Sequence, residues 1–285
     1  MAAAKTSPRK AAAKKPAATK TAAKSTAAKA PKAKAPAAKG ARMSLAEAMS
    51  ALEKAGSEQT RKTYRRHGAV DPMFGVSFAT LKTLVKRIGV DHDLARALWE
   101  TGNHDAQILA YKIADPARVS PDDLDRWVRT NRMRMCGGYV CMLAAESPYG
   151  AAKAAQWLAA PEGPERAAGW GLVGRLSMLD EATPDAWFVQ RLAAIEASIH
   201  AAPNAEREEM NMALIAIGCR NTALRKAALA AAKRIGKVDV DHGDTSCKTP
   251  DAAQYIEKAW AHSTSKGFES PAAHERSREP MRTRC

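Results

Sequence analysis

Carboxylate, imidazole and thiol side chains gather in the segment from Asp239 to Cys247, which holds three Asp, one His and one Cys within nine residues. Side chains of these types bind metal ions or transfer protons when a fold brings enough of them together. A structural zinc site uses four Cys or His ligands, whereas only His242 and Cys247 lie near each other here. We therefore predict no metal site and no cofactor. We interpret the segment as a hydrogen-bonded turn that leads to Thr249, the expected cap of the next helix.

Basic side chains that suit phosphate groups occur in three further clusters. They are Tyr64-Arg65-Arg66, then Arg132 and Arg134 before Gly137-Gly138, then Arg220, Arg225 and Lys226 after a helix end. Arginine forms bidentate contacts with phosphate, and glycine lets a phosphate approach the backbone closely. Each cluster has an ordinary alternative, which is a solvated loop or helix end without a ligand.

The first 42 residues differ in composition from the rest, with twelve Lys or Arg, eighteen Ala, four Pro and neither Asp nor Glu. Such a segment cannot bury enough apolar surface to offset the entropy of ordering it, so we predict a disordered tail. Lysines distributed along such a tail, Lys14 and Lys15 among them, suit a polyanion, because each phosphate they neutralise releases condensed counterions. The tail resembles the Lys/Ala/Pro tails of linker histones and some bacterial nucleoid proteins. A solubilising tail without a partner is the alternative, and a transit peptide is a weaker one because lysine replaces arginine.

The formal net charge of the chain is +15, and its first 42 residues hold twelve of the 45 Lys and Arg and none of the 30 Asp and Glu. Basicity is therefore mainly a property of the tail. No run of 18 apolar residues is present, and the five cysteines show no CxxC spacing. We expect a soluble, cytoplasmic, nucleoid-associated protein with reduced thiols and no membrane partner.

Apolar residues recur with helical spacing through residues 43–265, and no convincing two-residue alternation interrupts them. A hydroxyl, a proline and an acid follow one another at Ser120, Thr183 and Thr249, which marks three helix starts. Further helices are predicted at Phe78–Ile88, Asp93–Trp99, His104–Ala114, Met135–Ala145, Ala151–Leu158, Arg166–Leu179, Ala205–Ile217 and Thr222–Ile235. Short helices that contact their sequence neighbours are typical of a HEAT-like α-solenoid, so we predict an all-α fold, with a compact helical bundle as the alternative. Residues 266–285 lack an apolar pattern and are expected to be a disordered C-terminal tail.

The order of several short motifs resembles that of bacterial DNA alkylation repair proteins of the AlkD type, over about residues 45–262. The motifs are Tyr64–Gly68, Phe74–Val76, Leu81–Leu84, Leu94–Trp99, Ala168–Leu172, Met212–Gly218 and Asp241–Pro250. The resemblance implies a HEAT-like solenoid that holds duplex DNA on a concave basic face. In active members it also implies a glycosylase that releases cationic alkylated purines.

The catalytic positions of that family do not carry over. Active members have a Trp and an essential Asp at positions that align here with Met133 and Gly137. An expected Arg falls on Ala167, beside Arg166, and a second aromatic position falls on Met212. Release of a cationic base needs a carboxylate near the sugar, which glycine does not supply.

We therefore predict a DNA-binding relative with weak or absent glycosylase activity. One alternative is an active glycosylase in which the alignment slips or another acid, such as Glu146 or Asp180, takes over. A protein-interaction scaffold is the second alternative. The predicted partner is double-stranded DNA, damaged or distorted, bound by a monomer. Its predicted contacts are Tyr64, Arg65, Arg66, Arg132, Arg134, Arg166, Arg220, Arg225, Lys226, Lys14 and Lys15.

Deleting residues 1–42 tests the role of the basic tail. If its lysines contact phosphates, the slope of log affinity against log salt should flatten by several units, because each contact contributes about 0.9. The slope is measured by titrating labelled duplex DNA at a series of salt concentrations. An unchanged slope would exclude the tail from DNA binding.

Overall fold

The computed structural model describes residues 42–131, 137–161 and 163–284. All of these residues belong to one compact unit, residues 41–285. Its helices are α1 (Leu45–Ala55), α2 (Glu58–Arg66), α3 (Phe78–Ile88), α4 (His92–Glu100), α5 (His104–Ile113), α6 (Pro121–Thr130), α7 (Gly137–Glu146), α8 (Gly150–Leu158), α9 (Pro164–Leu179), α10 (Asp185–Ser198), α11 (Asn204–Gly218), α12 (Thr222–Ile235), α13 (Ala252–Ser265) and α14 (Pro271–Arg276). The described part of the chain contains no strand, in agreement with the predicted all-α fold. No described helix combines the length and the apolarity that a membrane crossing requires.

The predicted helices form within one or two residues of their expected ends because the sequence supplies the caps. Ser44 and Glu47 form a capping box at the start of α1. Ser120 caps α6 by accepting a hydrogen bond from the backbone of Asp123, with proline at the first helical position. The helix predicted from Met135 is described from Gly137 onward.

Two of the predicted caps are wrong. Thr183 does not cap α10, because its hydroxyl donates to the Asp180 carboxylate instead. Thr249 does not cap α13, because Asp251 does so by accepting from the backbone of Gln254 at 2.8 Å. At α13 the acid that follows the threonine is the better hydrogen-bond acceptor. At α10 the N-cap position is Pro184, and no side chain caps the helix.

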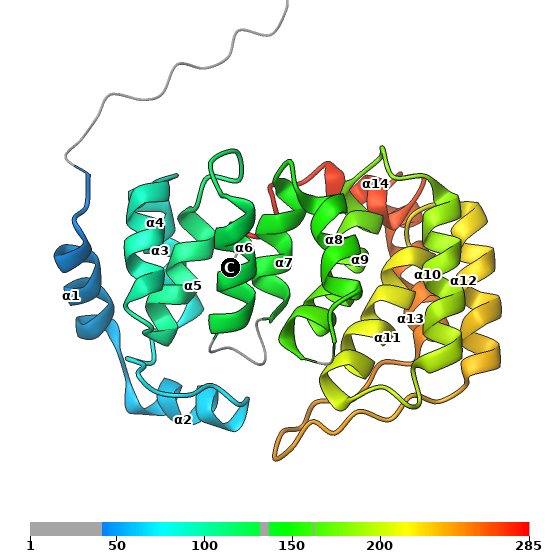
Figure 1. Cartoon of the computed structure of the whole chain (residues 1–285), viewed down its shortest axis with the longest axis horizontal. Coiled ribbons are helices and arrows are strands. Elements are labelled where there is room, and N and C mark those ends of the chain that lie inside the picture. Colours follow the sequence, from blue (N-terminus) through cyan, green and yellow to red (C-terminus); the bar gives the residue numbers. More distant parts are fainter. Residues whose placement is uncertain (1–41, 132–136, 162, 285) are drawn as a thin grey trace, which may run out of the picture. The chain divides into compact units, whose positions relative to one another are not determined.

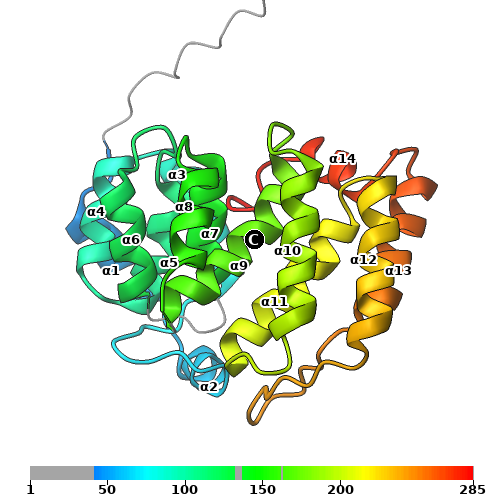
Figure 2. The ribbon, with the colours of Figure 1, turned by 45° about the vertical axis from the view of Figure 1, so that its right-hand side comes forward.

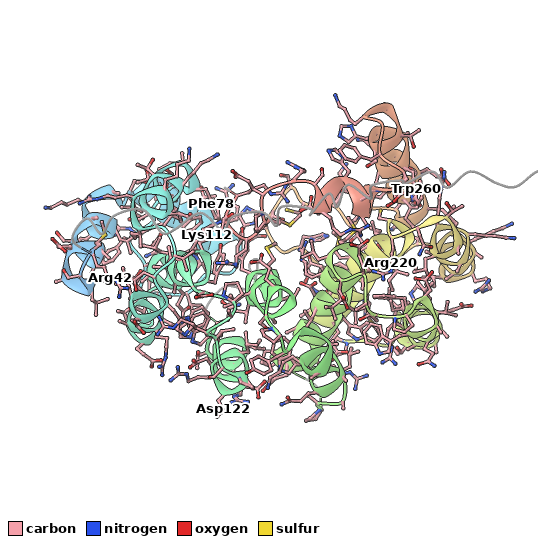
Figure 3. All side chains as sticks on the ribbon, turned by 90° about the horizontal axis from the view of Figure 1, so that it is seen from above. Arg42, Phe78, Lys112, Asp122, Arg220 and Trp260 are labelled. Carbon is pink, nitrogen blue, oxygen red and sulfur yellow. The ribbon has the colours of Figure 1, made fainter. Side chains whose placement is uncertain are left out.

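The helices stack as two layers (Figures 1 and 2). Each even-numbered helix from α4 to α12 packs against the odd-numbered helix that follows it, and α5, α7, α9, α11 and α13 contact one another in that order. Seen from above, the helices stand end-on along an arc within this unit (Figure 3). This is the stacking of sequence neighbours that a HEAT-like solenoid requires.

Stacked aromatic rings join neighbouring repeats in both layers. Trp99 of α4 lies parallel to Trp127 of α6, with ring centroids 4.4 Å apart. Tyr111 of α5 stacks on Tyr139 of α7, also with centroids 4.4 Å apart. Such pairs contribute about 0.5–1.5 kcal/mol beyond the burial of their area, so they help to fix the spacing of successive repeats.

The expectation of a disordered segment after residue 265 is wrong for the described residues 266–284. Helix α14 packs on α9 and α13, and the residues after it reach back to α5 and α7. Arg282 is 3% exposed and donates to the backbone carbonyls of Tyr111 and Lys112, each at 2.7 Å. It also pairs with Glu146 at 3.0 Å. The sequence pattern missed this segment because it is held by charge and carbonyl contacts, which leave no apolar periodicity.

Replacing Arg282 by Gln should lower the free energy of unfolding by about 3 kcal/mol, because it leaves the largely buried Glu146 carboxylate without its cation. Urea denaturation of the full chain measures this. The control is Arg278→Gln, since Arg278 is half-exposed and lies 3.7 Å from its partner Glu275. A loss at Arg282 no greater than at Arg278 would show that the segment after α14 does not stabilise the fold.

Candidate nucleic-acid interface

The end of α2 and the loop between α12 and α13 meet at one end of the stacked helices (Figure 1). Arg65, Arg66 and His67 line a pocket of about 190 Å³ whose opposite wall includes His242 and Cys247. The first turns of α11 complete it through Glu208 and Glu209. Segments about 175 positions apart in the sequence therefore form one surface, which we call the α2–loop edge.

Helix α2 supplies most of the positive charge of this edge. Arg65 is anchored by Glu58 at 3.5 Å and by Asp71 at 3.2 Å. Lys62 and Arg66 are four residues apart, so they lie on the same side of the helix, and both are exposed. Neither forms an ion pair with any residue that the structure describes. Cations that are exposed and unpaired can contact phosphate without first breaking an internal bond.

The loop opposite α2 is held by backbone contacts. Asn204 donates to the carbonyl of Asp241 and accepts from its N–H, both at 2.8 Å. The His242 imidazole lies 3.1 Å from the Thr249 hydroxyl and 4.0 Å from the Glu208 carboxylate. Within the described ranges, no group of three or more Cys, His, Asp or Glu is arranged to hold a metal ion. The loop therefore presents a fixed turn toward α2.

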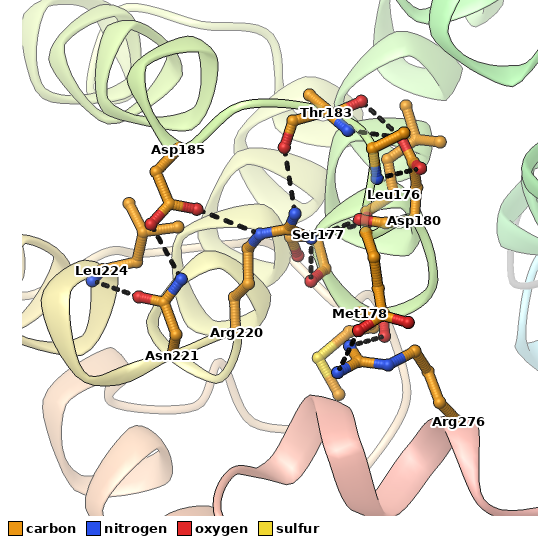
Figure 4. Close-up of polar contacts among 12 residues, drawn as sticks. Leu176, Ser177, Met178, Asp180, Thr183, Asp185, Arg220, Asn221, Leu224 and Arg276 are labelled. Carbon is orange, nitrogen blue, oxygen red and sulfur yellow. Dashed lines mark hydrogen bonds and ion pairs between the residues drawn. The ribbon is translucent and has the colours of Figure 1, made fainter. Parts of the chain in front are cut away.

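Two predicted contacts are corrected because their side chains belong to the interior. Tyr64 is 6% exposed, and its hydroxyl donates to the carbonyl of Val76 at 2.5 Å. Arg220 is 8% exposed and lies over the ring of Phe188. It pairs with Asp185 at 3.2 Å and also donates to carbonyls at the end of α9 and in the α9–α10 connection (Figure 4). Neither side chain is available to a phosphate.

Three other predicted contacts lie at the surface and differ in the ion pairs that they form. Arg166 lies 3.1 Å from the buried carboxylate of Glu206. Arg225 pairs with Glu257 and lies over the ring of Trp260. Lys226 is exposed. Arg132, Arg134, Lys14 and Lys15 lie outside the described residues.

Glu146 and Asp180, the two acids considered as replacements for the missing catalytic Asp, have structural roles instead. Glu146 holds Arg282, and Asp180 accepts from the backbone of Ala182 at 2.8 Å and from Thr183. Although burial opposes ionisation of Asp180, the hydrogen bonds from Thr183 and Ala182 keep its pKa below the ordinary value. Both carboxylates therefore serve the fold.

A carboxylate that the sequence did not single out stands in a more unusual position. Glu209 lines the α2–loop pocket and also a second pocket of about 340 Å³ between the first turns of α9 and α11. It reaches the face of α9 because Gly171 has no side chain: a Cβ there would lie 2.9 Å from its Oε2 atom. No hydrogen bond joins Glu209 to another residue within the described ranges. This close approach of a glutamate on α11 to a glycine on α9 could not be recognised in the sequence.

Burial raises the pKa of Glu209 to about 7, against the opposing charge of Arg175 and with a smaller contribution from Glu208. The thiol of Cys141 lies on the same side of Gly171, and burial together with Glu209 raises its pKa as well. Glu209 can thus exchange a proton near neutral pH. Catalytic acids and bases need a pKa near neutral pH, and some structural carboxylates also have one.

Comparisons with known proteins place these features in context. A sequence model described as DNA alkylation repair enzyme matches residues 48–256. The uncharacterized protein Lin0241 of Listeria innocua is 28% identical over 216 residues, which cover 73% of this chain and 93% of the relative. The uncharacterized protein Lmo0209 of Listeria monocytogenes is 27% identical over the same shares.

A solved structure superposes with a TM-score of 0.71 and 29% identity, covering 80% of this chain and 96% of the other. It is described as a new family of proteins related to the HEAT-like repeat DNA glycosylases with affinity for branched DNA structures. The likeness confirms the predicted HEAT-like fold.

Glu209 should give the stability of the protein a measurable pH dependence. Between pH 4.5, its ordinary pKa, and about 7, the folded protein keeps a proton on Glu209 that the unfolded chain has lost. Stability therefore falls as pH rises through this window. Glu209→Gln should remove the fall and stabilise the protein at pH 8 by about 3 kcal/mol, at about 1.4 kcal/mol for each pKa unit.

Urea denaturation at a series of pH values measures this effect. Glu53→Gln is the control, because it removes the same charge from an exposed glutamate of α1 that forms no ion pair with the described residues. Parallel pH curves for the wild type and Glu209→Gln would show that Glu209 ionises normally.

Proposed function

Since the chain belongs to the DNA alkylation repair enzyme family, whose sequence model matches residues 48–256, we propose that it is a DNA-binding member of that family without the family's glycosylase chemistry. The α2–loop edge is the surface through which it holds DNA, and the basic tail adds sequence-independent affinity. The convergence of Arg65, Arg66 and the 242–247 loop around one pocket carries this proposal. The protein acts on nucleoid DNA as a monomer.

Branched DNA is the preferred form of the partner in this proposal. The solved relative is described as having affinity for branched DNA structures, and it is 29% identical to this chain. A branch point offers phosphates in several directions, whereas a straight duplex presents them along one axis. An edge built from a helix end and a loop on opposite sides of a pocket suits phosphates that arrive from different strands.

The lack of glycosylase chemistry is supported by the side chains at the aligned positions. Gly137 brings no carboxylate, and Ala167 and Met212 bring neither a guanidinium nor an aromatic face. Asp125, the nearest acid upstream, is bound by Lys153 and the indole N–H of Trp157, both at 2.7 Å. None of these groups places a negative charge where it could stabilise an oxocarbenium-like transition state.

A second candidate function rests on Glu209. A half-buried carboxylate that lines a pocket and exchanges its proton near pH 7 has the properties of a relocated catalytic acid. In that case the protein would be an active glycosylase for cationic alkylated purines. The same carboxylate would attract the positive charge of such a base.

Binding to a three-way DNA junction and to a linear duplex of equal length tests the first proposal. The full chain should bind the junction more tightly in fluorescence anisotropy. Arg66→Glu should weaken junction binding by on the order of tenfold and reduce the salt slope by about 0.9, because one phosphate contact is lost. The control is Arg118→Glu, which reverses an exposed charge in the connection between α5 and α6. That connection lies at the opposite end of the helices from α2 (Figure 1). If Arg66→Glu and Arg118→Glu bind alike, the α2–loop edge is not the DNA contact.

A further inference from the structure

A pocket of about 480 Å³ opens between α11, α12 and the start of α13. It shares no lining residue with the α2–loop pocket. Leu214, Leu229, Ala232 and Val238 give it apolar walls, and Lys233 and Lys237 belong to its lining. We call it the α12–α13 pocket. It combines apolar surface with positive charge, which are the two properties that an unstacked nucleotide requires of a binding site.

The cations of this pocket are placed for a phosphate. Lys233 is exposed and forms no ion pair with the residues that the structure describes. Lys237 pairs with Asp239 at 2.8 Å, but both side chains are more than 80% exposed, so the pair exchanges readily with a competing anion. The N-terminal end of α13 also lines the pocket through Ala252 and Ala253. Its backbone N–H groups and helix dipole favour negative charge.

Two negative groups limit where a phosphate can lie. Asp251 lines the pocket, but its carboxylate is turned to the helix and accepts from the backbone of Gln254 at 2.8 Å. Asp239 stands beside Lys237 on the exposed side. Neither carboxylate pairs with Lys233, so Lys233 is the principal cation that the described part of the pocket offers to a phosphate.

A buried amide provides an independent sign of a ligand. Asn211 lines the pocket and is 1% exposed. Its Nδ2 donates to the carbonyl of Pro250 at 3.0 Å, so its Oδ1 must act as the acceptor. That oxygen is buried without a hydrogen-bond partner in the structure. Buried acceptors are nearly always paired, so an occupant that donates to Oδ1 completes the site.

We propose that the α12–α13 pocket binds one unpaired nucleotide of DNA. The phosphate is held by Lys233, Lys237 and the start of α13, the base packs against the apolar walls, and a ring or exocyclic N–H donates to Asn211 Oδ1. Every natural base carries such a donor, so the pocket selects an unpaired base without selecting its identity. The proposal rests on the proposed function, since it assumes that DNA is the partner and names the part of a branched DNA that is read.

The experiment uses the full chain and a three-way junction with a single unpaired 2-aminopurine at the branch point, compared with the same junction carrying an abasic site there. The wild type should bind the first junction several-fold more tightly and change its 2-aminopurine fluorescence, because only that junction offers a base to the pocket. Ala253→Phe, which fills the pocket, should abolish both the preference and the fluorescence change. Ala230→Phe is the control, since Ala230 is exposed on α12 and does not line the pocket.

Lys233→Gln with Lys237→Gln keeps the test valid if Ala253→Phe does not fold. Both lysines are exposed, so the double variant should fold normally and bind the 2-aminopurine junction on the order of tenfold more weakly, with a salt slope lower by about 1.8. Lys266→Gln removes a lysine from the other end of α13 as the control.

The outcomes separate this inference from the proposed function. If the wild type binds the 2-aminopurine and abasic junctions equally well and the pocket variants bind as tightly as their controls, the pocket inference is wrong while DNA binding stands. If the wild type binds none of these DNAs, the proposed function and the inference fail together.

Discussion

The parallel stacking of the odd-numbered helices is the constraint on which the rest of the structure depends. Because α5, α7, α9, α11 and α13 pack on one another in order, each even-numbered helix must return the chain to the same end before the next begins. The first turns of α9 and α11 consequently lie side by side, and α2 and the 242–247 loop close around the same end. A surface for a large ligand is therefore built from helix starts and loops, while the helix bodies form the core.

The arginine side chains of this chain form two groups: some hold the stacked helices together, and others face solvent. Arg220 and Arg282 are almost fully buried, and each satisfies backbone carbonyls at helix ends that would otherwise lack partners. Arg66 lies exposed at the end of α2 and forms no ion pair with the described residues. Composition counts all of these cations equally, so it does not show which of them a polyanion can contact.

The helices and their order could be predicted from the sequence because apolar spacing and Ser-Pro-acid signals are local. Phe78–Ile88 and Thr222–Ile235 have the predicted ends. The absence of caps from Thr183 and Thr249 could not be predicted, since the capping residue depends on where the loop turns. The segment after α14 was missed because Arg282 and Lys112 meet across 170 positions of the sequence.

The site was harder to predict than the fold for the same reason. Tyr64 and Arg65 are neighbours in the sequence, yet the first lies in the core and the second at the surface. Glu209 attracts no notice in the sequence, because its environment comes from Gly171 on another helix. A basic or aromatic motif identifies the types of side chain present, whereas the packing of α2 against the start of α5 decides which of them a ligand can reach.

The most direct test of the account is the release of methylated purines from alkylated duplex DNA by the full chain under single-turnover conditions, run beside a binding titration on the same DNA. We expect the protein to bind this DNA without releasing more base than DNA alone does. Release that disappears in Glu209→Gln would contradict it, and would show that the family's chemistry persists with its carboxylate moved to α11.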